Sequence, residues 1–180
     1  IPSVVLGFFA LQFITPNVVR GLYPGAQSAN FLAAGIAVGI LTIPLVASVS
    51  EDAMRAVPNS LREASYGLGA KQWHTALRVV FPAAISGIIA AVILGISRAV
   101  GETMVVALAA GLNGIMTFNP TEGGLTMTGA IANLAVGSDQ VAGDSAAFQS
   151  LFFVGLVLFV LTLGLNVISG RVVRRYRQRY

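Results

Sequence analysis

Long apolar segments alternate with polar ones along this chain. A helix that crosses the hydrocarbon core of a bilayer needs about 20 predominantly apolar residues. Four segments approach or reach that length, namely residues 1–14, 31–49, 83–112 and 151–169. The first is short, and the third is long enough to tilt or to extend past the bilayer. The pattern therefore predicts an all-α, polytopic transmembrane helical bundle, with residues 1–180 forming a single membrane domain.

Basic residues are unevenly distributed among the polar segments. Segment 51–82 carries four and the last ten residues carry five, whereas segment 113–148 carries none. Lys and Arg are concentrated on the cytoplasmic side of membrane proteins. We therefore expect loop 51–82 and the C-terminus to be cytoplasmic and loop 113–148 to be external. Within the external loop, residues 125–137 are predicted to form a surface or re-entrant helix, and Asp139 and Asp144 to lie in turns.

The composition agrees with a membrane protein and excludes several other classes. Charged residues make up 10% of the chain and hydrophobic residues 56%, whereas soluble domains carry about 25% charged residues. There is no cysteine and only one histidine, His74, so neither a disulfide framework nor a metal site is expected. The net charge of +4 does not indicate nucleic-acid binding, because the basic residues cluster at the C-terminal membrane flank. The chain begins at Ile1 without a charged leader, unlike a signal peptide.

The polar segment 51–82 predicts two short helices. Ser60 and Glu63 have the S-x-x-E spacing of a capping box, in which each side chain bonds a free N–H at the start of the helix. Gly67 and Gly69 are predicted to end that helix, since glycine tolerates the left-handed conformation found there.

A second helix is predicted to begin near Lys71. It carries one apolar stripe, which is typical of an amphipathic helix at a membrane surface. Pro82 is predicted to begin the third span, where its missing N–H costs little. The stripe consists of Trp73, Leu77, Val80 and Phe81.

The spacing in this segment resembles the cytoplasmic motif of the permease subunits of bacterial ABC importers. That motif reads E-A-A, three residues, G, nine residues, I-x-L-P, and this chain has Glu63-Ala64-Ser65, Gly69 and a terminal Val79–Pro82. The resemblance implies that the helix–turn–helix docks on an ATPase subunit and transmits its movement to the spans. It assigns ATPase docking to Glu63, Ala64, Ser65 and Gly69. The alternative is that Glu63 only caps a helix and Gly69 only ends one.

Arg98 and Glu102 lie within the apolar run of the third predicted span. An Arg at the centre of a membrane helix costs about 2.5–3.5 kcal/mol on the insertion scale. Residues four apart share a helix face, so the two are expected to pair, on the face that also carries Gly87, Ala91 and Gly95. One interpretation is a structural ion pair that joins helices. The other is a substrate path. There Glu102 partly neutralises the charge of Arg98, so that the arginine binds an anion weakly enough to release it.

The segment Arg98–Thr103, R-A-V-G-E-T, resembles the R-A-x-G-E-T of phosphate importer permeases. Met104 after that segment, and the T-M-T at residues 126–128, are similar to the PstC type. The resemblance implies a type I importer permease core (MetI-like) whose substrate path for inorganic phosphate includes Arg98, Glu102 and Thr103. Permeases of this type normally have further spans, which we expect to precede Ile1.

The sequence also bears on where the energy for transport comes from. The chain has no G-x-x-x-x-G-K-[ST] loop for nucleotide phosphates, and no Ser/His/Asp set or paired membrane carboxylates for hydrolysis. We therefore expect a transport subunit rather than an enzyme, with no cofactor of its own and with ATP and Mg²⁺ bound by a partner.

The expected partners are ABC ATPase subunits, a second paralogous permease, an external phosphate-binding protein and the lipid bilayer of the bacterial inner membrane. The alternatives are a permease for sulfate or molybdate, a passive anion channel, and a membrane scaffold.

Overall fold

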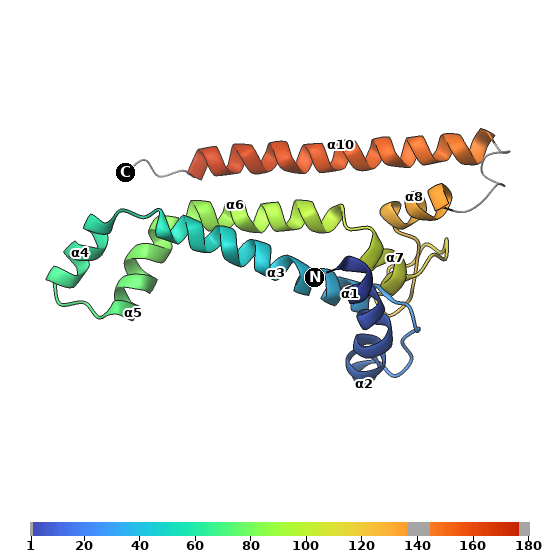
Figure 1. The fold of residues 1–180 in the computed structure, drawn as a ribbon, viewed down its shortest axis with the longest axis horizontal. Helices are drawn as coiled ribbons and strands as arrows, with labels where there is room; N and C mark the ends of the chain where they lie inside the picture. Colours follow the sequence, from blue (N-terminus) through green and yellow to red (C-terminus); the bar gives the residue numbers. More distant parts are fainter. Residues whose placement is uncertain (1, 137–144, 177–180) are drawn as a thin grey trace. The chain divides into compact units, whose positions relative to one another are not determined.

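The computed structural model describes residues 2–136 and 145–176, and every regular element in those two ranges is a helix (Figure 1). Two segments, η1 and η2, have the wider π-helical turn. The elements in order are α1 (Ser3–Phe9), η1 (Ala10–Val19), α2 (Arg20–Leu22), α3 (Phe31–Arg55), α4 (Asn59–Gly67), α5 (Gln72–Thr75), η2 (Ala76–Val80), α6 (Phe81–Val100), α7 (Met104–Ala110), α8 (Met127–Val136) and α10 (Ser145–Tyr176). Asp139, Asp144, Arg177 and Arg179 lie outside the described residues.

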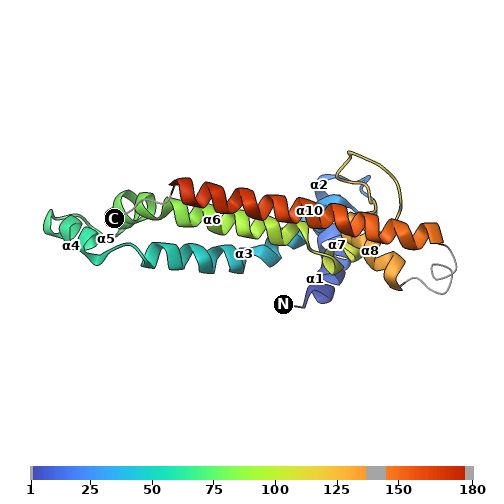
Figure 2. The same ribbon diagram turned by 90° about the horizontal axis from the view of Figure 1, so that it is seen from above.

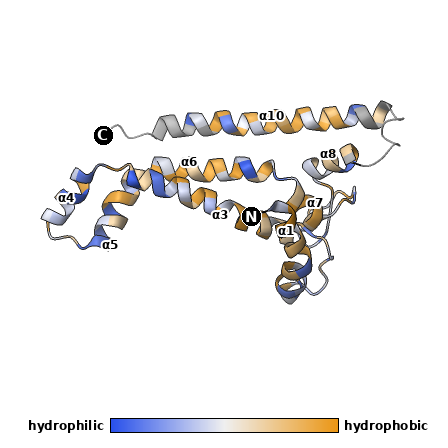
Figure 3. Ribbon diagram, in the orientation of Figure 1, coloured by the Kyte–Doolittle hydropathy of each residue, from blue (hydrophilic) through white to orange (hydrophobic). Residues whose placement is uncertain are grey.

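Four helical stretches are long and apolar enough to cross a membrane: Ser3–Leu22, Phe31–Arg55, Gln72–Val100 and Gln149–Ile168. Figure 3 shows apolar residues along most of α6 and α10. The number of spans predicted from the sequence is therefore confirmed by length and composition. The prediction for the third span is wrong at both ends, since the helix begins at Gln72 and stops at Val100 instead of running from 83 to 112.

The third span stops because the helix tightens and then breaks. The N–H groups of Gly101 and Glu102 donate to the carbonyls three residues earlier, those of Arg98 and Ala99, each at 3.2 Å. Such bonds mark the tight last turn of a helix. A separate helix, α7, begins at Met104. Because α7 is as apolar as α6, hydropathy alone merged the two helices.

Both π-helical segments are associated with a proline. Pro16 lies inside η1, and Pro82 follows η2 by two residues. A proline has no N–H to donate, and its ring clashes with the carbonyl four residues earlier; for Pro82 that carbonyl belongs to Arg78 in η2. A wider turn makes room for the ring. Pro82 therefore does not begin a span, as the sequence had suggested, and the helix passes through it.

The chain divides into two compact units. The first comprises residues 1–41 and 98–163, and the second comprises residues 42–97 and 164–180. In the first unit, α1 packs against α7 (Figure 2), and small side chains let them approach. A Cβ on Gly7 would lie 3.1 Å from the Cα of Val105. The buried core of this unit includes Leu6, Ala10, Ile14, Val19, Ala33, Ala37, Val105 and Ala109.

A buried asparagine holds the loop before α3 in the first unit. Asn30 is fully buried, and its Oδ1 accepts the N–H of Ala33 at 2.8 Å, which satisfies a free donor at the start of α3. Its Nδ2 donates to Thr15 Oγ1 at 3.2 Å and to the Gln27 carbonyl at 3.0 Å. The asparagine therefore caps α3 and ties it to η1. Asn30 could have been found from the sequence, because Asn ahead of an apolar run is a recognised signal for the start of a helix.

In the second unit, α3 and α6 approach closely through the small residues of α6. A Cβ on Gly95 would lie 2.6 Å from Val46 Cγ2, and a Cβ on Gly87 would collide with the Cβ of Ala53. The sequence placed Gly87 and Gly95 on one face of this helix, and α3 packs against that face. Near the end of α3, a smaller core forms from Val57, Val80 and Ala84.

Candidate functional site

The polar segment after α3 folds as a helical hairpin, formed by α4, the turn 68–71 and α5 with η2. The turn is closed by Gly69, whose φ of 79° lies in the left-handed region. The N–H of Gly69 donates to the Tyr66 carbonyl at 2.8 Å, and that of Ala70 donates to the Ser65 carbonyl at 3.2 Å. These two bonds form a Schellman motif. The prediction that Gly69 ends the first helix is confirmed.

The predicted capping box at the start of α4 is wrong. The helix begins at Asn59, one residue before the expected cap, and the N-cap position is Pro58, which has no side chain that can accept a bond. Ser60 is therefore already inside the first turn, and Glu63 is not at the third position of the box. No side chain caps the helix, and Glu63 is exposed. The alternative interpretation, that Glu63 only caps the helix, is therefore wrong.

A buried hydroxyl pair joins the two arms of the hairpin. Ser65 Oγ and Thr75 Oγ1 lie 2.8 Å apart, and the Thr75 side chain is almost completely inaccessible. Ser65 therefore faces α5, whereas Glu63, Ala64 and Gly69 are exposed. Of the four residues assigned to docking, Ser65 therefore holds the two arms of the hairpin together, and the other three are on the surface. Thr75 was missed because nothing in its local pattern distinguishes an inward threonine from a solvated one.

The hairpin is also fixed to the end of α3. Arg62 Nη2 donates to the Met54 carbonyl at 2.8 Å, which satisfies a carbonyl in the last turn of that helix. By contrast, the ion pair between Arg55 and Glu51, at 2.6 Å, joins two exposed side chains and contributes little to stability. The hairpin is therefore anchored by Arg62.

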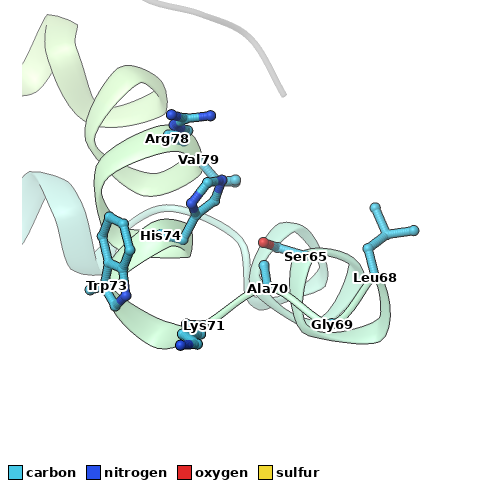
Figure 4. A pocket seen from close by; sticks show the side chains of 9 residues that line it. All are labelled: Ser65, Leu68, Gly69, Ala70, Lys71, Trp73, His74, Arg78 and Val79. Atoms are coloured by element: carbon cyan, nitrogen blue, oxygen red, sulfur yellow. The ribbon is translucent and has the colours of Figure 1, made fainter.

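An open hollow of about 520 Å³ lies between the arms of the hairpin (Figure 4). Lys71 and Arg78 contribute positive charges to it, and no carboxylate is among its lining residues. Leu68 is 90% exposed and Trp73 63% exposed, which are large apolar areas for a solvated surface. The chemistry suits a protein partner that brings apolar and acidic groups. The lining consists of Ser65, Leu68, Gly69, Ala70, Lys71, Trp73, His74, Arg78 and Val79.

The apolar stripe predicted for the second arm is only partly confirmed. Trp73, Leu77 and Phe81 are exposed, at successive intervals of four residues, whereas Val80 is buried in the small core near the end of α3. His74 lies edge-on to Trp73, with ring centroids 5.5 Å apart. No cluster of three or more potential metal ligands occurs among the residues that were described.

The second candidate region is the break between α6 and α7. The predicted pairing of Arg98 with Glu102 is wrong, because the helix ends at Val100 and the two residues no longer share a helix face. Within the described chain, the single ion pair at 4.0 Å or less joins Arg55 and Glu51. Arg98 is exposed and Glu102 half-buried. The ion pair predicted between Arg98 and Glu102 is therefore not formed.

The break instead brings the Glu102 carbonyl beside the start of α8. Thr128 Oγ1 donates to the Glu102 carbonyl at 2.8 Å, and Thr103 Oγ1 lies 3.4 Å from the Gly101 carbonyl. The helix predicted near residues 125–137 is confirmed as α8, whose first turn carries Thr128. A cavity of about 240 Å³ adjoins the break, lined by Ala99, Val100, Glu102, Val106, Thr126, Met127, Thr128, Leu158 and Leu161.

Ser97, the residue before Arg98 in the sequence, is a further polar residue that its sequence pattern does not mark as a site. Its Oγ is buried in α6 and has no hydrogen-bond partner, the single such side-chain atom in the part of the chain that the structure describes. A buried hydroxyl without a partner is costly, so it is a position to test for a bound ligand.

Comparison with known proteins finds a transport family and several permeases that are similar to this chain. The family described as "Binding-protein-dependent transport system inner membrane component" matches residues 1–178. The chain is 36% identical over 162 residues to the probable ABC transporter permease protein YqgH of Bacillus subtilis, covering 90% of this chain and 51% of that protein. It is 32% identical over 195 residues to phosphate transport system permease protein PstC 1 of Mycobacterium tuberculosis, covering 97% and 57%.

A relative named PstA also matches. The chain is 32% identical over 170 residues to phosphate transport system permease protein PstA of Mycobacterium leprae, covering 94% of this chain and 52% of that protein. The chain thus spans about half the length of the curated relatives it matches. No solved structure matches the chain.

Proposed function

Because the chain belongs to the family of binding-protein-dependent transport system inner membrane components, we propose that it forms the translocation path of an ATP-driven importer for inorganic phosphate. The observation that carries this proposal is the position of the phosphate-permease-like segment Arg98–Thr103. It lies where a helix of membrane-spanning length ends. There the backbone turns, Arg98 is exposed, and the half-buried Glu102 lines a cavity.

An anion that crosses a bilayer needs a positive charge along its way, and Arg98 is the only basic residue between Arg78 and Arg171. A charge inside a membrane is retained at a cost, which favours a functional role. We propose that Arg98 attracts the anion, and that Glu102 and Thr103 line the next part of the path. The names of the relatives with phosphate transport support this choice of substrate over sulfate or molybdate.

We further propose that the hairpin is the cytoplasmic contact for ABC ATPase subunits, which bind ATP and Mg²⁺. Glu63, Ala64 and Gly69 are exposed on it, and its hollow combines apolar and basic groups. The second arm continues into α6 without a non-helical residue, as one helical stretch from Gln72 to Val100. We propose that a displacement of the hairpin is passed to the span through this continuous helical backbone.

The proposed assembly contains this permease, a second paralogous permease, two ATPase subunits and an external phosphate-binding protein. It lies in the bacterial inner membrane with loop 51–82 and the C-terminus in the cytoplasm and loop 113–148 outside. The distribution of basic residues supports this orientation.

The substrate path is tested with the complete complex in proteoliposomes. ATP-dependent uptake of radiolabelled phosphate is expected, with competition by unlabelled phosphate but not by sulfate or molybdate. Arg98→Gln is expected to abolish uptake while the complex still assembles, and Arg98→Lys to keep a fraction of it, because Lys retains the charge. Loss of assembly in Arg98→Gln would assign a structural role to Arg98. Phosphate flux without ATP would indicate a channel, and no flux of any oxyanion would indicate a scaffold.

The ATPase contact is tested by Glu63→Arg, which reverses an exposed charge without touching the hairpin core. Transport is expected to fall while membrane insertion is unchanged, and ATP hydrolysis no longer to follow phosphate transport. Asp52→Arg is the matched control, since Asp52 is another exposed acidic residue outside the hairpin. Normal coupling in Glu63→Arg, or equal loss in both variants, would contradict the assignment.

A further inference from the structure

The backbone at the break between α6 and α7 needs hydrogen-bond partners that the helices do not supply. In lipid, a polar backbone group without a partner is costly, so breaks within membrane-spanning regions are satisfied by neighbouring protein groups. The tight turn accounts for the N–H groups of Gly101 and Glu102. For the carbonyl of Glu102, the partner is the hydroxyl of Thr128, at 2.8 Å. A residue 26 positions away thus fixes the peptide group that joins Glu102 to Thr103.

The start of α8 is built to present this hydroxyl. Thr126 Oγ1 accepts the N–H of Gly129 at 3.1 Å, which caps the helix. The carbonyl of Thr126 accepts the N–H of Ala130 at 2.7 Å. A Cβ on Gly129 would lie 3.9 Å from the Cα of Ala107, so α8 packs directly on α7. Thr128 is only 5% exposed, and its hydroxyl is therefore shielded from competition by water.

We propose that Thr128 is a positioning residue, through which the external helix α8 sets the orientation of Glu102 and Thr103 in the translocation path. This inference rests on the proposed function, because it takes those two residues as path residues. The peptide plane between them rotates if its carbonyl loses the Thr128 hydroxyl, and both side chains then turn with it. A protein that delivers substrate from outside and contacts α8 can shift the path by displacing one hydrogen bond.

The test compares Thr128→Val, which keeps the shape and removes the hydroxyl, with Thr128→Ser, which keeps the hydroxyl. Thr162→Val is the matched control, because Thr162 Oγ1 donates to the Leu158 carbonyl of its own helix at 2.9 Å and joins no second element. Each variant is made in the complete complex. If Thr128→Val does not assemble, Thr128→Ala removes the same hydroxyl with a smaller side chain.

Two readouts are used, one of which is independent of phosphate. The first is phosphate uptake, separated into maximal rate and KM. The second is the reaction rate of a water-soluble thiol reagent with a cysteine introduced as Ala99→Cys, which lines the cavity beside the break. The present sequence has no cysteine, so the label is specific if the remainder of the complex is also made cysteine-free.

Loss of the hydroxyl is expected to lower the maximal uptake rate and to change the labelling rate, each by about threefold to about eighteenfold, the range that single interhelical hydrogen bonds in membranes support. Thr128→Ser should remain close to the wild type in both measurements, and Thr162→Val should not differ from it. Unchanged labelling in Thr128→Val would overturn the proposal. An equal change in Thr162→Val would also overturn it, since it would indicate general loosening.

The phosphate assignment and the positioning role of Thr128 can be refuted independently of each other. If the wild-type complex takes up no phosphate, the assignment of phosphate is wrong. The thiol reaction still decides whether Thr128 holds the break. If uptake falls in Thr128→Val with no change in labelling, the residue affects transport by another route and the positioning role is refuted.

Discussion

Replacing Gly69 by larger residues separates two explanations for a glycine in the hairpin turn. Its φ of 79° is unfavourable for residues with a Cβ, and a Cβ placed there would meet no atom within 4 Å. The whole effect of Gly69→Ala on the isolated hairpin is therefore conformational, at about 1–2 kcal/mol. Such a cost lowers the population of the closed turn by about 5-fold to 30-fold. Asn tolerates this conformation better than Ala, and β-branched Val tolerates it least.

The order of the variants is the diagnostic result. If the turn conformation matters, phosphate transported per ATP hydrolysed should fall in the order Gly, Asn, Ala, Val. If a partner instead needs an empty space at residue 69, Asn should be worse than Ala, because it is larger. Amide hydrogen exchange at Gly69 and Ala70 should accelerate in the same order as coupling falls, since both N–H groups are bonded only in the closed turn.

Gly67→Ala is the control for these variants. Gly67 lies two residues away in the last turn of α4, it has no positive φ, and a Cβ on it would also meet no atom within 4 Å. Ala is favoured over Gly inside a helix by up to about 1 kcal/mol, so this variant should couple normally. Equal uncoupling in Gly67→Ala, or the poorest coupling in Gly69→Asn, would refute the conformational explanation.

Three further predictions concern buried contacts. Ser65→Val should remove the short bond to Thr75, whose hydroxyl keeps only its 3.4 Å contact with the Lys71 carbonyl. The hairpin should lose about 0.5–1.5 kcal/mol, measured by amide exchange of residues 59–80. In Gly87→Ala, the new Cβ would collide with the Cβ of Ala53. This overpacking should lower the free energy of unfolding by about 1–3 kcal/mol, seen as a lower melting temperature of the complex. Adding Ala53→Gly to Gly87→Ala should recover part of that loss. Ser97→Ala should be neutral for stability; reduced uptake with normal assembly would indicate that its hydroxyl binds substrate.

Features that depend on local composition could be predicted from the sequence. The four spans follow from apolar length, and the end of α4 follows from a glycine at the required position. The close approach of α3 and α6 follows from glycines that recur on one helix face. Each of these is determined by residues within one or two helical turns, so no knowledge of distant contacts was needed.

Features that depend on distant contacts could not be predicted. The break after Val100 lies between two equally apolar helices, and the carbonyl that it exposes is satisfied by Thr128 from a different segment. The inward position of Ser65 depends on Thr75 in the other arm. The capping box failed for a local reason, since Pro58 rather than Ser60 takes the N-cap position and a pattern of four letters does not fix where the helix begins.

The separation of Arg98 from Glu102 changes the physical account of how an anion would leave the proposed path. With an ion pair, the carboxylate would weaken the attraction of the guanidinium for substrate. Without one, water must do so, and Arg98 is exposed. Two unit charges 4 Å apart attract by about 1 kcal/mol in water but by about 4 kcal/mol at an effective dielectric constant of 20. Under the proposed function, an arginine that is hydrated in the complex attracts phosphate weakly enough to release it within the same cycle. Thr128 holds Glu102 through its backbone carbonyl, and the Glu102 carboxylate forms no ion pair with Arg98 among the described residues.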